Sequence, residues 1–157
     1  MKIASMKGAY VLIIEIEQPV SVEIKSLGEV MFESGTWVYV GSAMGTGSTN
    51  LENRLKRHFR SEKTVYWHID HLLNKEVELR KAYWTESPTH AECNIAQQLE
   101  SGGLFITGPK RFGSSDCTHG CEAHIFRYNS NTGIDETIES AFVDQGFRPS
   151  MTTDGLL

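Results

Sequence analysis

Short apolar segments rich in Val, Ile and Tyr follow one another near the start of the chain, which predicts closely spaced β-strands. Strands are expected over 10–16 and 36–40, and residues 20–25 and 30–32 are expected to pair as a hairpin around a turn at 27–29. Because so little chain separates these segments, neighbouring strands should run in opposite directions. The pattern therefore predicts an antiparallel sheet.

The rest of the chain mixes helical and strand patterns. Its expected elements are a helix over 51–60, a short helix over 66–73, a strand over 77–85, a helix ending near Leu99, a strand over 122–128 and a helix over 136–145. The helix ending near Leu99 starts either after Ser87 or later, at a capping box formed by Thr89 and Glu92. The predicted fold class is α+β: a small antiparallel sheet flanked by helices, with an inserted hairpin and a C-terminal strand and helix extension.

The expected helix over 51–60 has apolar residues at every fourth position, the spacing of one helical face, at Leu51, Leu55 and Phe59. This stripe is expected to pack on the core. Arg54 and His58 are also four residues apart and lie beside the stripe. One edge of the helix should therefore bring a guanidinium and an imidazole toward the sheet.

Positive charge is concentrated in and after this helix. Residues 54–63 hold five of the 15 Lys and Arg residues, and only Glu62 offsets them there. Two interpretations stay open: a solvated charged face, or contact with phosphate groups, for which the Arg fork is well shaped. Under the second interpretation the DNA-binding residues are Lys56, Arg57, Arg60 and Lys63.

Composition narrows the class of protein. The chain has 157 residues, 39% hydrophobic and 22% charged, as in a soluble globular domain, and we expect residues 1–157 to form one domain. No apolar run approaches the roughly 20 residues that span a bilayer, so no membrane partner is expected. Three cysteines favour free or metal-bound thiols in a reducing cytoplasm. The net charge of -5 argues against a chain coated with nucleic acid but allows a local basic footprint.

Three segments resemble, in this order, the motifs of the GIY-YIG nuclease superfamily: Gly8-Ala9-Tyr10, Tyr39-Val40-Gly41, and the run from Asn53-Arg54 to His58-Phe59. The later segments YWHIDHLL, AEC and FGSSDC resemble the Uri-type branch of that superfamily, so that the resemblance covers about residues 8–128. It implies a sheet of three antiparallel strands flanked by helices. It also implies hydrolysis of DNA phosphodiester bonds that depends on Mg²⁺ or Mn²⁺.

The same resemblance implies roles for individual residues. Tyr10 and Tyr39 match the tyrosines of the first two motifs, and Arg54 matches the catalytic arginine. His58 matches a position held by histidine or tyrosine, and Glu92 matches a metal-binding glutamate on a later helix. Taken singly, the tyrosines also fit aromatic packing and Glu92 also fits helix capping.

These residue types suit the chemistry. A positioned Arg stabilises the charge that builds on the phosphate oxygens, and a lone carboxylate with waters suits Mg²⁺. The proton of the attacking water goes either to Tyr10, if a nearby cation lowers the pKa of this phenol, or to His58, which titrates near neutrality.

Two more clusters carry ionisable side chains. In YWHIDHLL, His68, Asp70 and His71 form either a metal site or a structural His–Asp hydrogen-bond network near the active residues. In SSDCTHGCEAH, Cys117, Cys121 and His124 form either a zinc site, with Cys93 as a further ligand, or a turn with small buried cysteines.

The sequence thus supports a metal-dependent DNA endonuclease, with DNA repair as its setting. Two alternatives stay open: a nucleic-acid-binding module that keeps the fold without cleavage, and a partner domain of a base-excision repair enzyme. Cleavage of plasmid and branched DNA in Mg²⁺ or Mn²⁺ separates the first hypothesis from the others.

Overall fold

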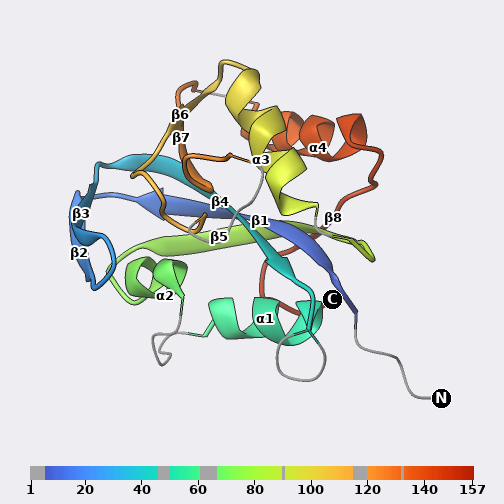
Figure 1. Cartoon of the computed structure of the whole chain (residues 1–157), viewed down its shortest axis with the longest axis horizontal. Coiled ribbons are helices and arrows are strands. Elements are labelled where there is room, and N and C mark those ends of the chain that lie inside the picture. The colour runs from blue at the N-terminus through green and yellow to red at the C-terminus, as the bar shows by residue number, and fades with distance from the viewer. Residues whose placement is uncertain (1–5, 46–49, 61–66, 90, 115–119, 132) are drawn as a thin grey trace.

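A six-stranded antiparallel sheet runs through the centre of the protein, with helices on both faces (Figure 1). The computed structural model describes residues 6–45, 50–60, 67–89, 91–114, 120–131 and 133–157. Across the sheet the strand order is β6–β7–β4–β1–β5–β8. The strands are β1 (Gly8–Ile16), β4 (Gly35–Ala43), β5 (Glu78–Glu86), β6 (Phe105–Thr107), β7 (Ile125–Tyr128) and β8 (Ser150–Thr152). A separate hairpin consists of β2 (Val20–Ile24) and β3 (Gly28–Phe32).

The helices form two layers, one on each face of the sheet (Figure 1). One face carries α1 (Leu51–His58) and α2 (His68–Leu73), and the other carries α3 (Glu92–Ser101) and α4 (Ile134–Asp144). Strand β1 contributes side chains to the core on both faces of the sheet, because successive side chains of a strand point to opposite faces. Its even-numbered residues from Tyr10 to Ile16 pack in the core beneath α1 and α2, whereas Ala9, Val11 and Ile13 pack beneath α3 and α4.

The predicted α+β class, with an antiparallel sheet, flanking helices and an inserted hairpin, is confirmed. The apolar stripe of α1 also packs as expected, with Leu51 and Leu55 buried and Phe59 against the same core. The sheet is larger than the three strands that the resemblance implies: β4, β1 and β5 form its centre, and β7, β6 and β8 extend it.

Three expected boundaries were wrong. Strand β7 begins at Ile125 and not at 122, where the strand was expected to start. Strand β4 does not end at Val40 but continues to Ala43. Helix α3 begins at Glu92, after Ala91, and has no side-chain cap, so neither expected start is found. The hydroxyl of Ser87 instead donates to the carbonyl of Thr89 at 2.9 Å, which holds this segment in a turn before the helix.

Position 41, within β4, is a glycine because the ring of Tyr10 occupies the space where a side chain would lie. The two residues are directly opposite in the β1–β4 register. A Cβ atom at position 41 would lie 2.5 Å from both Cζ and the hydroxyl oxygen of Tyr10. The glycine therefore serves close packing of a buried ring against the strand, and it does not interrupt the strand.

We expect Gly41→Ala to lower the free energy of unfolding by about 1–3 kcal/mol, because the added Cβ would force the buried Tyr10 ring to shift. Gly102→Ala is the matched control, since a Cβ there meets its nearest atoms at an ordinary 3.6 and 3.7 Å. Urea unfolding followed by circular dichroism measures both. Equal midpoints for the two variants would contradict the packing argument.

Candidate active site

Tyr10 and His58 form a buried pair between the sheet and α1. The Tyr10 hydroxyl and His58 Nε2 are 2.8 Å apart. Tyr10 is only 1% exposed and His58 only 2%. His58 is the last residue of α1, whose start is fixed by Asn50 Oδ1 accepting a hydrogen bond from the Asn53 amide at 2.8 Å. The helix cap and the strand register together position the pair.

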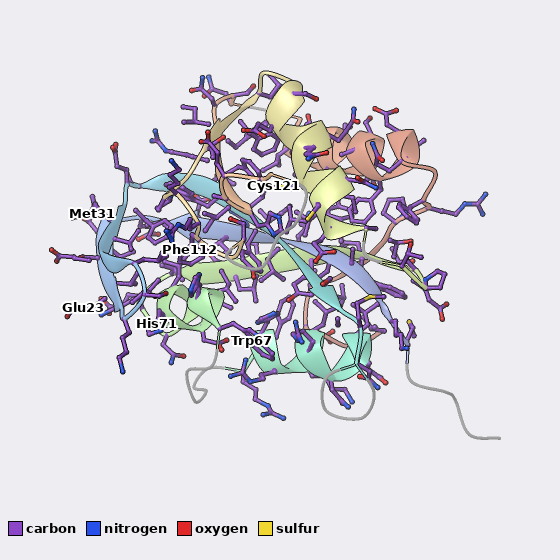
Figure 2. The ribbon with its side chains drawn as sticks, in the orientation of Figure 1. Glu23, Met31, Trp67, His71, Phe112 and Cys121 are labelled. Atoms are coloured by element: carbon purple, nitrogen blue, oxygen red, sulfur yellow. The ribbon has the colours of Figure 1, made fainter. Side chains whose placement is uncertain are left out.

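Arg54 lies one helical turn before His58 and reaches the end of β4. Its Nη1 donates a hydrogen bond to the Ser42 carbonyl at 2.6 Å. The Arg54 guanidinium also lies 3.9 Å from the ring centroid of Trp67, a residue just before α2 (Figure 2). This contact and the hydrogen bond hold the guanidinium in place. Among the ion pairs of the described residues, none joins Arg54 to a carboxylate.

Ser42 connects the two faces of the sheet. Its side chain lies on the α3 side, where Oγ donates to Glu92 Oε2 at 2.9 Å, while its carbonyl accepts from Arg54. This is possible because β4 pairs with β7 only over Trp37–Tyr39. Beyond Tyr39, the side chains of Arg54 and Glu92 approach β4 from opposite sides, and both bind Ser42.

The structure thus brings together the five residues predicted for catalysis and metal binding: Tyr10, Tyr39, Arg54, His58 and Glu92. Tyr39 is the most peripheral of them, with its ring centroid 6.5 Å from that of Tyr10 and 6.3 Å from that of Phe112. Its surroundings are those of a core aromatic residue. Ser42 and Trp67 belong to the site but were not predicted, because their contacts depend on the tertiary structure.

Burial dominates the ionisation of both tyrosines. It raises the pKa of Tyr10 to about 12, although the charge of Arg54 and a hydrogen bond from it act in the lowering direction. Burial likewise raises the pKa of Tyr39 well above its ordinary value. For Tyr10 alone to take the proton at neutral pH, a nearby cation would have to lower its pKa. The pKa is raised instead, so this condition is not met.

The raised pKa predicts a loss of stability in alkali. An unfolded Tyr10 ionises near pH 10, whereas the folded one keeps its proton to about pH 12. Between these values the folded state binds more protons, so the free energy of unfolding falls as the pH rises, by about 2–3 kcal/mol for this group.

We expect Tyr10→Phe to reduce this alkaline loss but not abolish it, because Tyr39 shifts in the same direction. Urea unfolding from about pH 9 to 12 measures the slope, and Tyr128→Phe is the control. A slope that Tyr10→Phe leaves unchanged would show that Tyr10 ionises freely in the folded protein.

The basic residues of α1 differ in their availability. The Lys56 side chain is 42% exposed, with Nζ 3.8 Å from Glu52 Oε2, and Arg60 is exposed. Arg57 instead pairs with Asp70, Nη1 to Oδ1, at 2.9 Å. Lys63 lies outside the described residues.

Asp70 and His68 make structural contacts around this site. Asp70 is fully buried, and besides Arg57 it binds the Trp67 amide at 2.8 Å, which starts α2. His68 Nε2 is 3.3 Å from Ser26 Oγ, and His68 Nδ1 accepts from the Gly113 amide at 3.0 Å. These bonds favour the structural interpretation of YWHIDHLL over a metal site.

The structure brings together three of the four residues named for the cysteine and histidine cluster. Among the described residues, Cys93, Cys121 and His124 have donor atoms within 4.8 Å of one another. Cys117 lies outside the described residues. Cys93, the expected further ligand, lies on α3 next to Glu92 of the active residues.

These features define an α+β protein with a small polar site at the end of a central strand. The chain belongs to the family described as domain of unknown function DUF123, whose model matches residues 9–146. No curated protein and no solved structure matches the chain. None of the helices in the described part of the chain has both the length and the apolar character needed to cross a membrane.

Proposed function

We propose that the protein is a metal-dependent DNA endonuclease that hydrolyses phosphodiester bonds, acting in DNA repair in the cytoplasm. The observation that carries the proposal is the bridge from Arg54 through Ser42 to Glu92, beside the Tyr10–His58 pair. A cation, a carboxylate and a proton-transfer pair within one short stretch are the groups that hydrolysis of a phosphodiester requires. The order of motifs that resembles the GIY-YIG superfamily supports the same assignment.

Glu92 is the residue that would hold Mg²⁺ or Mn²⁺. It is half-buried at the start of α3, and Oε2 accepts one hydrogen bond from Ser42, which orients the carboxylate. A single carboxylate completed by waters and phosphate oxygens is the usual arrangement for Mg²⁺. Such an ion, when bound, neutralises charge on the phosphate and on the leaving oxygen.

Arg54 stabilises the charge that develops on the phosphate. Its guanidinium is fixed by the Ser42 carbonyl and by the Trp67 ring, so little reorganisation is needed when the reaction begins. Arg57 lies over the same Trp67 ring, 4.7 Å from its centroid, and is itself held by its ion pair with buried Asp70. Arg57 is thus proposed to position Trp67 as well as to contact DNA.

Tyr10 and His58 move the proton of the attacking water. Since burial keeps the Tyr10 hydroxyl protonated at neutral pH, it passes its own proton to His58 Nε2 across the 2.8 Å hydrogen bond as it accepts one from water. His58 becomes the imidazolium and Tyr10 stays neutral. The two groups that were alternatives for the general base thereby act in series.

The test is cleavage of supercoiled plasmid and of branched DNA by the purified chain in Mg²⁺ or Mn²⁺, with EDTA as the control. We expect nicking that needs the metal and that His58→Ala abolishes. The burial of both Tyr10 and His58 favours one rival, a module that binds nucleic acid without cutting it. Binding without cleavage in any divalent metal would establish that rival and overturn the nuclease.

DNA affinity should fall as salt rises, with a modest slope, because few cations of α1 face solvent. Lys56→Ala combined with Arg60→Ala should weaken binding and reduce the slope by roughly 2, since each substitution leaves one phosphate without its cation. Fluorescence anisotropy over a salt series measures this. Lys75→Ala with Arg148→Ala is the control for loss of net charge, and an equal effect of the control pair would contradict a specific footprint.

A further inference from the structure

We propose that Cys93, Cys121 and His124 bind a zinc ion that joins the start of α3 to the segment entering β7. The site is separate from the proposed Mg²⁺ site and does not rest on the nuclease function. It has two thiols and one imidazole, the ligand types that zinc prefers. Cys93 lies 28 residues before Cys121 and 31 before His124, so it meets the other two only in the folded protein.

The distances fit a shared ion. In a tetrahedral site with Zn–S of about 2.3 Å and Zn–N of about 2.0 Å, neighbouring sulfur and nitrogen ligands are about 3.5 Å apart. Cys93 Sγ and His124 Nε2 are 3.7 Å apart, and the donor atoms of all three residues lie within 4.8 Å of one another. The donor atoms therefore need to move by only about an ångström to share a zinc ion.

The backbone that carries these side chains is already fixed. The His124 amide donates to the Phe112 carbonyl at 2.9 Å, and the His124 carbonyl accepts from the Val40 amide of β4 at 2.8 Å. Cys93 lies in the first turn of α3, and Cys121 Sγ is 3.8 Å from the Cys93 carbonyl. Ligands held this way lose little conformational freedom when they bind a metal.

The surroundings favour the form of cysteine that binds metals. Cys93 is the second residue of α3, where the positive end of the helix dipole favours a thiolate. Cys93 and His124 are buried, 5% and 3% exposed, whereas Cys121, labelled near α3 in Figure 2, is half-buried. Neither described cysteine is in a disulfide.

The decisive experiment measures metal content and coordination in the full chain. After purification without an affinity tag and reconstitution with Zn²⁺ under reducing conditions, we expect about one zinc per chain by plasma mass spectrometry. Replacement by Co²⁺ should give the strong visible bands of a tetrahedral ion and a sulfur-to-metal charge-transfer band in the near ultraviolet. Cys93→Ser and Cys121→Ser should each lose the charge-transfer intensity and the tight binding.

Two control variants separate this site from other metal binding. His71→Gln, a half-buried histidine on α2, should keep the zinc, whereas His124→Gln should lose it. Glu92→Gln should also keep it, although it removes the proposed Mg²⁺ ligand one residue from Cys93. Retained zinc in Glu92→Gln shows that the two sites are distinct whatever its effect on cleavage.

Three results would overturn the proposal without depending on how well a variant folds. They are a wild-type chain that takes up no zinc on reconstitution, a Co²⁺ spectrum that lacks the sulfur band, and a Cys93–Cys121 disulfide in protein kept under reducing conditions. The last of these, found by peptide mass spectrometry, would assign the cluster to redox chemistry instead.

Discussion

Arg54→Ala is expected to lower the rate of metal-dependent cleavage by roughly 100-fold or more while leaving DNA affinity within a few-fold. The guanidinium acts on charge that develops only in the transition state, so its loss should appear in the rate and not in ground-state binding. Single-turnover cleavage and fluorescence anisotropy on the same DNA measure the two quantities separately.

Arg80→Ala is the control for this change. Arg80 is a surface arginine on β5, 53% exposed and 3.8 Å from Glu15, and its removal should change neither quantity. Because Arg54 also stacks on Trp67, the melting temperature of Arg54→Ala must be compared with that of the parent. If a folded Arg54→Ala cuts at the parental rate, Arg54 has only a structural role.

Glu92→Gln should abolish cleavage at limiting Mg²⁺, because an amide is a much weaker ligand for a hard cation than a carboxylate. The substitution keeps the size of the side chain and an oxygen that accepts from Ser42 Oγ. The loss should be partly reversed by raising the metal concentration, which Arg54→Ala should not show. Glu100→Gln, at the exposed end of the same helix, is the control.

Cleavage by Glu92→Gln that equals the parent over a full Mg²⁺ titration would remove Glu92 from the site. Asp70 is then a poor replacement, since it is fully buried against Arg57 and the Trp67 amide. Asp116 would be the next carboxylate to test, although it lies outside the described residues.

Local patterns were enough to predict the residues of α1. The spacing of Leu51 and Leu55 fixes which face is buried, and this decides that Arg54 and His58 point toward the sheet. Most strands and helices could be placed for the same reason, to within three residues at either end apart from the start of α3. Strands β6 and β8 could not, because three residues at a sheet edge carry too little periodicity.

What the sequence could not supply are contacts between distant segments. Glu92 and Ser42 are 50 residues apart, and their hydrogen bond depends on α3 starting at Glu92 and β4 continuing past Gly41. The choice of Cys93 as the partner of Cys121 and His124 also depends on where α3 packs. The pKa of Tyr10 needed the same information, because burial and not charge dominates it.

The central place of β1 has a consequence for how the chain is made. This apolar strand is made before both of its neighbours, β4 and β5, and the second of them ends only at Glu86. Until then one edge of β1 has no partner, so the nascent chain carries an apolar strand with an open edge while residues 17–86 are made. Sheets closed by such distant pairings form slowly. Chaperones that hold extended apolar segments should therefore engage this protein at its N-terminal strand during synthesis.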